Sequence, residues 1–164
     1  MKKTILIGLG ILLVIIQFIR PEKNESNDLT YDISSKYQVT EEVNHLLQVS
    51  CNDCHSNNTK YPWYANVQPI TWWLNDHIID GKRHLNFSEF TNRPIAIQNH
   101  KLEEIIEEVK EHEMPLESYT YLGLHKKANL TDAQRKVITN WAQAQMDLLK
   151  ANYPADSLVM PRRR

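Results

Sequence analysis

The chain opens with an apolar run that no later segment matches. Residues 4–19 are apolar apart from Gly8, Gly10 and Gln17, with two lysines before the run and Arg20 after it. Basic residues ahead of such a run are typical of an export signal, and the run is slightly short of the roughly 20 residues that span a bilayer comfortably. A buried core helix is the alternative interpretation, but so apolar an N-terminus rarely packs inside a domain.

We therefore predict that residues 1–20 form a signal or membrane anchor. No Ala-x-Ala cleavage site follows the run, which favours an anchor that is retained. Because the two lysines would stay inside by the positive-inside rule, the soluble part is expected on the periplasmic or extracytoplasmic side. Residues 21–36 are polar and without helical period, and we interpret them as a tether.

Helical periodicity begins after the tether. Thr40 is placed to cap a helix with an acidic first turn and with Val43, Leu46, Leu47 and Ser50 on one face. A second buried stripe is predicted for Ile70, Trp73, Leu74, His77 and Ile78, with Gly81 as the C-terminal cap.

Two further helices are predicted in the C-terminal half. Residues 94–111 place Ile95, Leu102, Ile105, Ile106 and Val109 inward and their glutamates outward. Thr131 and Gln134 form a capping box that opens a helix with Val137, Ile138, Trp141, Ala144 and Leu148 facing inward. With only four glycines in the chain, these patterns predict an all-α domain over residues 37–150 and a tail over 151–164.

Charge and motifs exclude several classes of function. The 19 basic and 20 acidic residues give a formal net charge of −1, so no overall basic field favours nucleic acid. The sequence contains no glycine-rich phosphate loop and no Gly-x-Ser-x-Gly motif, which removes support for nucleotide binding and serine hydrolysis.

The candidate chemistry lies at Cys51, Cys54 and His55, which form a Cys-x-x-Cys-His motif directly after the predicted 40–50 helix. Two thiols at this spacing, followed at once by a histidine, suit covalent c-type haem attachment with the histidine on the iron. A zinc site is the first alternative, but it would need histidines such as His77 or His112 because the chain has no third cysteine. A dithiol redox site is the second, although the motif here does not follow a strand.

Met114 is the predicted sixth iron ligand. It lies after the third predicted helix and before Pro115, which restricts the local backbone. Methionine opposite histidine is an electron-transfer ligation that raises the reduction potential. Core filling is the usual role of a methionine, and four histidines stay open as alternative ligands: His77, His84, His100 and His112.

The order of these motifs resembles class I cytochrome c, and more specifically the haem-binding domain family. The resemblance covers roughly residues 37–150 and rests on Cys51 to Ser56 together with later motifs: Tyr61-Pro62-Trp63-Tyr64, Pro69, Trp72-Trp73, His77-Ile78, Gly81-Lys82-Arg83 and Leu85-Asn86-Phe87-Ser88. It implies a cytochrome-c-like helical fold with haem c joined through Cys51 and Cys54 and ligated by His55. The chain departs from relatives at Leu116, where Met-Pro-Pro is frequent.

Other aromatic and basic side chains are candidates for contact with the haem. Four aromatic residues are candidates for contact with the porphyrin edge, although such residues more often fill a core: Trp63, Tyr64, Trp72 and Trp73. Basic residues 82–84 are candidates for the haem propionates, while His77 is more often a buried, satisfied histidine than a ligand.

Three functions follow as expectations. The first is a membrane-tethered electron carrier without catalytic residues, whose redox partner the sequence does not name. The second is a haem protein with an open iron site, either peroxidase-like or binding a small ligand. The third is a module without haem, with reduced or zinc-loaded cysteines.

Overall fold

The protein is built from helices. The computed structural model describes residues 2–121 and 124–160, and the extended pairing in that part of the chain amounts to one isolated bridge, Glu25 with Asn58. The longer helices are α1 (Lys2–Ile16), α2 (Glu41–Ser50), α4 (Ile70–His84), α5 (Ile95–Lys110) and α7 (Asp132–Asn152). Shorter elements are α3 (Asn52–His55), α6 (Glu117–Thr120) and the 3-10 turns η1 (Ile33–Ser35), η2 (Trp63–Asn66), η3 (Phe87–Glu89), η5 (Lys126–Ala128) and η6 (Ala155–Leu158). The all-α prediction is confirmed.

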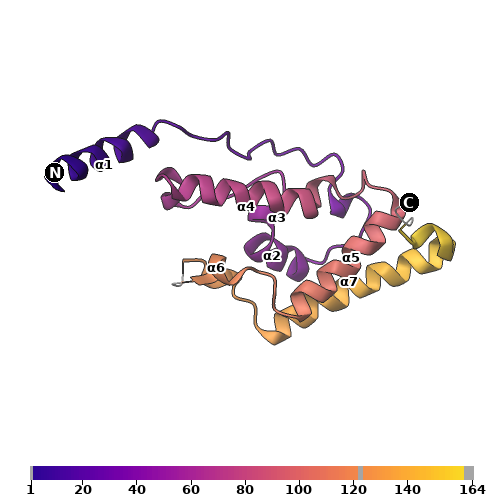
Figure 1. The fold of residues 1–164 in the computed structure, drawn as a ribbon. Helices are drawn as coiled ribbons and strands as arrows, with labels where there is room; N and C mark the ends of the chain where they lie inside the picture. The colour runs from indigo at the N-terminus through magenta and orange to yellow at the C-terminus, as the bar shows by residue number, and fades with distance from the viewer. Residues whose placement is uncertain (1, 122–123, 161–164) are drawn as a thin grey trace.

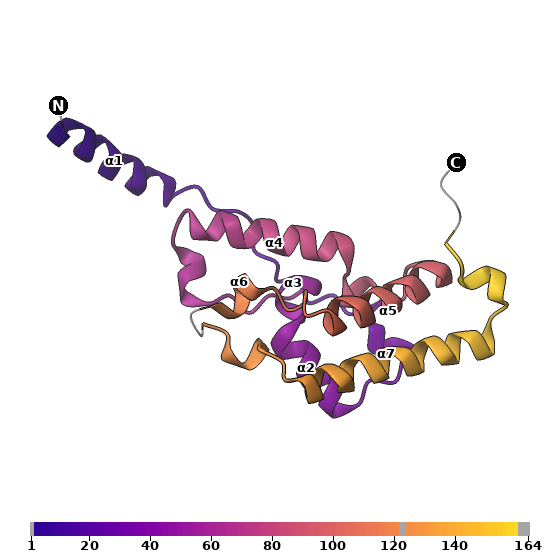
Figure 2. The same cartoon turned by 60° about the horizontal axis from the view of Figure 1, so that its bottom comes forward.

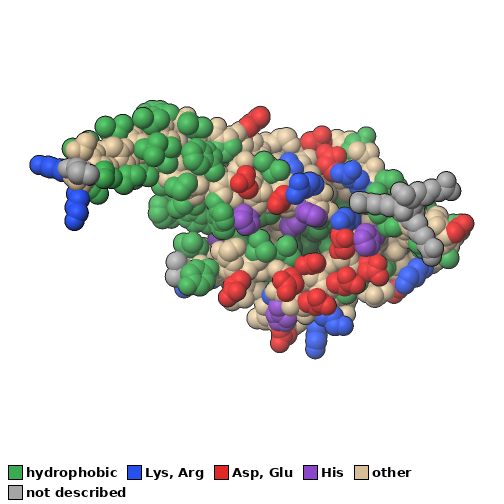
Figure 3. All heavy atoms as spheres, in the orientation of Figure 1, with side chains coloured by type: hydrophobic (Ala, Val, Ile, Leu, Met, Phe, Trp, Pro, Cys, Tyr) green, Lys and Arg blue, Asp and Glu red, His purple; other side chains and the backbone are tan. Residues whose placement is uncertain are grey.

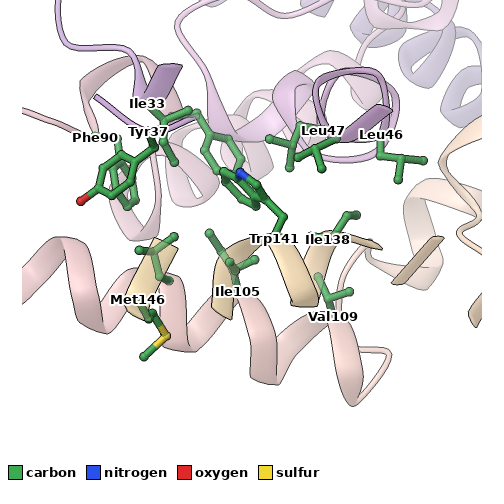
Figure 4. Close-up of a cluster of buried hydrophobic side chains, with 14 of the residues drawn as sticks. Ile33, Tyr37, Leu46, Leu47, Phe90, Ile105, Val109, Ile138, Trp141 and Met146 are labelled. Carbon is green, nitrogen blue, oxygen red and sulfur yellow. The ribbon is translucent and has the colours of Figure 1, made fainter. Parts of the chain in front are cut away.

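The main core lies where α5 and α7 pack side by side and α2 meets α7 (Figures 1 and 2). Leu102 and Ile138 are fully buried at its centre. Trp141 projects from α7 toward α2 (Figure 4), and its indole nitrogen donates a hydrogen bond of 2.9 Å to the carbonyl of Gln38. Leu158 of η6 is also buried in this cluster, so the chain beyond α7 contributes to the core.

The predicted caps of α2 and α7 are confirmed. Thr40 Oγ1 accepts from the amide of Val43 at 3.3 Å. At α7, Thr131 and Gln134 form the reciprocal capping box. The inward face of α7 differs from the prediction, because Ala144 and Leu148 are exposed. Toward the C-terminus the buried face of α7 is shifted by about one residue from the predicted one. The buried positions there are Ala142, Gln145, Met146 and Leu149.

Helix α4 does not end at Gly81, and its predicted stripe is only partly buried. The helix continues to His84, so Gly81 is an interior residue and not a C-terminal cap. Leu74 and Ile78 are buried, whereas Ile70 and Trp73 are 40% and 46% exposed. The reason is that this half of the stripe lines a cavity instead of packing on another helix.

Helix α1 extends away from the rest of the protein, and its apolar side chains are exposed (Figure 1). None of the described helices combines the length and the apolar character that crossing a membrane requires. The polar residues after α1 run along the rest of the helical domain: Asn24 Nδ2 donates to the carbonyl of Ser56 and to Thr59 Oγ1. The segment predicted as a tether thus contacts the chain next to the Cys-x-x-Cys-His motif.

Candidate functional site

The Cys-x-x-Cys-His motif forms a tight helical turn at the end of α2. The amide of Cys51 donates to Leu47 and closes α2, and the amides of Cys54 and His55 both donate to the carbonyl of Cys51, at 3.1 and 2.9 Å. The two cysteines are not paired in a disulfide. The turn therefore presents two free thiols and an imidazole from one short segment.

His55 is held in a defined orientation by two backbone carbonyls. Its Nδ1 lies 3.0 Å from the carbonyl oxygens of both Gly81 and Leu85. Because both partners can only accept, Nδ1 carries the proton and Nε2 keeps its lone pair. Desolvation lowers the pKa of His55, an effect that the two backbone hydrogen bonds oppose, so the imidazole is neutral near pH 7. A neutral histidine fixed through Nδ1 is the form that ligates a metal through Nε2.

Gly81 allows α3 and α4 to approach closely enough for this contact. A Cβ atom at position 81 would lie 2.6 Å from the carbonyl oxygen of Cys54, a distance that non-bonded atoms do not adopt. Gly81 is therefore required by the close approach of the motif, and its carbonyl then serves His55.

A cavity of about 370 Å³ lies beside Cys54. Its size is within the range of small-molecule and cofactor sites. The lining comes from η2, α4 and the segment around α6: Cys54, Trp63, Tyr64, Ile70, Trp73, Leu74, His77, Leu116, Ser118, Tyr119 and Leu124. Most of these side chains are apolar or aromatic, which suits the face of a porphyrin.

Some of the aromatic residues predicted to contact the porphyrin line this cavity. Trp63 and Tyr64 line the cavity, and so does Trp73, which the sequence assigned to a buried stripe. Trp72 is not part of the lining, and its indole nitrogen donates to the carbonyl of Ile19 at 3.0 Å.

The two thiols are in an environment that keeps them protonated. Burial raises the pKa of both Cys51 and Cys54 to about 11. Dithiol redox sites need at least one thiol with a lowered pKa, so this environment does not favour the redox alternative. Among the described residues, no three His, Cys, Asp or Glu side chains gather at one point as ligands for a metal ion, which gives the zinc alternative no ligand set there.

Met114 lies on the segment that leads from α5 to the cavity. Its amide donates to the carbonyl of Glu108 at 3.1 Å, and its carbonyl accepts from Arg135 Nη1 at 2.6 Å, so its backbone is fixed. The side chain is half-buried. Met114 is not part of the described cavity lining, whereas Leu116, two residues later, is.

The four alternative histidine ligands differ in their positions. His77 lines the cavity, with its Nδ1 2.9 Å from the carbonyl of Trp73. His100 lies within 3.0 Å of Glu104, and His112 within 3.7 Å of Asp132, both outside the cavity lining. His84 is exposed at the end of α4.

The basic residues predicted for the propionates already have protein partners. Lys82 Nζ donates to Asn24 Oδ1 at 2.6 Å, and Arg83 forms an ion pair with Asp80. Their proposed contact with propionates stays a prediction.

A polar cluster beside the cavity was missed from the sequence. Tyr119 donates to Asp53 Oδ2 at 2.6 Å and stacks on His125 with ring centroids 4.0 Å apart. His125 Nε2 is hydrogen-bonded to the hydroxyl of Tyr64. These residues come from η2, α3, α6 and the start of η5, so no local spacing connects them. The cluster ties the segment around α6 to the Cys-x-x-Cys-His turn.

The arrangement fits haem. It combines an apolar cavity lined by Cys54 with Cys51 and His55 in the adjoining turn, both outside the described lining, and the imidazole has its Nδ1 proton fixed. No curated protein and no solved structure matches this chain significantly. The model of the family described as "Haem-binding domain" matches residues 11–144 of the 164. The chain therefore belongs to the haem-binding domain family.

Proposed function

We propose that this protein carries one covalently attached c-type haem and transfers single electrons outside the cytoplasm, held at a membrane by its N-terminal segment. Cys51 and Cys54 form the attachment, His55 is the proximal ligand and Met114 the sixth. When bound, haem supplies a one-electron Fe(III)/Fe(II) couple.

The orientation of His55 is the observation that carries the proposal. Two backbone carbonyls 3.0 Å from Nδ1 fix the tautomer and the plane of the ring. Outer hydrogen bonds of this kind orient metal-bound histidines and make them more basic ligands. Since Nδ1 is occupied, Nε2 is the nitrogen available to iron.

The cysteines support covalent attachment by their spacing and state. Each thiol is free and protonated, and Cys54 lines the cavity. When a cysteine adds to a vinyl group, its sulfur forms a bond to one vinyl carbon and the hydrogen goes to the other. The addition needs no oxidant or reductant.

Met114 is proposed as the sixth ligand because its segment borders the cavity. Arg135 and Glu108 hold the backbone at this point, and Leu116 lines the cavity. The thioether would reach the iron if the segment shifts when haem binds.

The proposed location follows from α1. Its apolar side chains are exposed, and two lysines precede them. At 1.5 Å per residue, its 15 residues are about 22 Å long, against a hydrocarbon core of about 30 Å. Anchoring therefore needs Phe18 and Ile19, which are also exposed, to enter the membrane with α1.

An open iron site is the second candidate, and one observation favours it. His77 and Tyr64 line the cavity, whereas Met114 is not part of the described lining. If Met114 stays away from the iron, an exogenous ligand can occupy the sixth position.

Optical spectra separate these two functions. The full chain is produced together with c-type maturation machinery and compared with Met114→Ala, using Met160→Ala as the control, because Met160 lies in the chain after η6. For the electron carrier, the sulfur-to-iron charge-transfer band of the ferric protein is lost in Met114→Ala and kept in Met160→Ala. An unchanged spectrum in Met114→Ala, with ready binding of carbon monoxide by wild type, would reject Met114 and favour the open site.

A further inference from the structure

The end of α1 is joined to the start of α4 by a set of hydrogen bonds. Gln17 exchanges two of them with the backbone of Gln68, accepting at 2.9 Å and donating at 3.3 Å. The carbonyl of Ile19 accepts from Gln68 Nε2 at 2.7 Å and from Trp72 Nε1 at 3.0 Å. The residues that follow α1 are therefore held beside the start of α4, while α1 itself extends away from the domain (Figure 2).

The stretch of chain next to this junction carries no charged residue of its own, but Arg20 donates to the carbonyl of Asn66 at 3.2 Å and Lys23 lies over the ring of Tyr61. Residues 61–75 contain three tryptophans and two tyrosines but no Asp, Glu, Lys or Arg. We call the exposed part, formed by Trp63, Val67, Ile70 and Trp73, the aromatic surface. Trp63 is 76% exposed, which is unusual for so large a side chain.

This surface continues both α1 and the mouth of the haem cavity. Hydrophobic side chains run from α1 onto the adjoining end of the soluble part, while acidic side chains gather elsewhere on the same face (Figure 3). Three of the four residues, Trp63, Ile70 and Trp73, also line the cavity. An apolar patch of this kind, rimmed by polar groups, marks a site of association.

The length of α1 indicates what covers the patch. A helix about 22 Å long in a hydrocarbon core of about 30 Å leaves several ångströms for flanking residues to fill. Tryptophan and tyrosine are the side chains enriched at the level of the lipid headgroups. Because the junction joins the residues after α1 to Gln68 and Trp72 at the start of α4, insertion of α1 would bring the aromatic surface to that level.

We propose that the aromatic surface lies in the headgroup region of the membrane that holds α1, so that the mouth of the haem cavity faces the bilayer. This inference rests on the proposed anchoring of α1. The partner is a lipid surface, and the contact is made by apolar and aromatic side chains without ion pairs.

Lipid photocrosslinking of the full-length, haem-loaded protein tests the proposal. The chain is reconstituted in phosphatidylcholine vesicles that contain two photoactivatable phosphatidylcholines, one reactive near the headgroup and one within the acyl chain, and adducts are mapped by mass spectrometry. We expect adducts on peptides of α1 and of residues 61–75. Peptides around Leu148, which is 54% exposed on α7, serve as the internal control and should stay at background.

Matched variants sharpen the result. Trp63→Asp combined with Val67→Asp should reduce adducts on residues 61–75 several-fold while adducts on α1 persist, and Leu148→Asp should change neither. Adducts confined to α1 would overturn the membrane contact of the aromatic surface and leave the anchor intact. If neither segment carries adducts and the protein no longer floats with the vesicles, both the anchor and the inference are overturned.

Discussion

The two halves of the helical domain differ in how their interiors are filled. Around α5 and α7, a large cluster of buried side chains forms the main core, with Leu102 and Ile138 fully buried. Around α3 and α4, the buried cluster is small, consisting of Ala65, Leu74 and Ile78, and it borders a cavity and exposed tryptophans. The first half has a core made only of its own side chains, whereas the second leaves a cavity that we propose haem fills.

Two tryptophans give the largest expected contrast. Trp141→Ala should lower the free energy of unfolding by about 3–5 kcal/mol, because a large buried side chain is lost, together with its hydrogen bond to Gln38. In the protein without haem, Trp63→Ala should change it by less than about 0.5 kcal/mol, as expected for an exposed side chain. Denaturant unfolding of the two variants measures both, and equal losses would contradict the contrast between the halves.

A smaller loss of folding stability is expected when the contact between α3 and α4 is disturbed. Gly81→Ala places a Cβ 2.6 Å from the carbonyl of Cys54, which forces the helices apart at a cost of about 1–3 kcal/mol. Alanine recovers up to about 1 kcal/mol of helix propensity, so the net effect is a moderate destabilisation. The shift should also weaken the contact of His55 with residue 81 and alter the haem spectrum.

Gly8→Ala is the control for that substitution, since nothing lies within 4 Å of a Cβ at position 8. It should leave thermal unfolding and the spectrum of the haem protein unchanged. A Gly81→Ala protein with wild-type stability and spectrum would show that α3 and α4 are not in such close contact.

The polar cluster beside the cavity should contribute less to the free energy of unfolding than the contact between α3 and α4. Tyr119→Phe removes the hydrogen bond to Asp53, and a hydrogen bond to a charged group contributes about 1.5–3 kcal/mol, with a value near or below the lower end for a partly exposed pair. Tyr121→Phe is the matched control, because Tyr121 is largely exposed. Thermal unfolding should separate the two, and an equal effect would remove the cluster's role in holding the α6 segment.

The smallest expected effect is a dependence of stability on pH through His125. Burial lowers the pKa of His125 below its ordinary value of 6.5, although the charge of Asp53 acts in the opposite direction. A histidine with a lowered pKa in the folded state binds protons more readily when unfolded, so its contribution to stability is present above pH 6.5 and is lost as the pH falls below it. His125→Gln should therefore flatten the fall in unfolding temperature between neutral and mildly acidic pH, and an identical pH profile would contradict this assignment.

Local signals in the sequence predicted the first half better than the second. The caps at Thr40 and Thr131 and the inward positions Leu102, Ile138 and Trp141 follow from helical period and short-range hydrogen bonds, and the structure confirms them. Helical period alone predicted that Leu148 faces inward. This prediction was wrong, because the packing of α7 on α5 shifts the buried face of α7.

The candidate site depends on contacts that period does not encode. The predicted haem-binding residues could be selected from a motif and a loop position: Cys51 and Cys54 for attachment, His55 and Met114 as iron ligands. The role of Gly81 could not be predicted, because a glycine near a helix end is interpreted as a C-terminal cap unless its contact with the neighbouring turn is known. The contact of Tyr119 with Asp53 joins residues 66 positions apart, which no local pattern predicts.

The covalent attachment of haem through Cys51 and Cys54 is the central claim, and denaturing electrophoresis with mass spectrometry tests it most directly. The full chain is produced with c-type maturation machinery beside a Cys51→Ala, Cys54→Ala variant. We predict that haem stays on the denatured wild-type chain, adding the mass of one haem, and is released from the variant. Release of haem from the denatured wild-type chain, with its mass unchanged, would contradict the account.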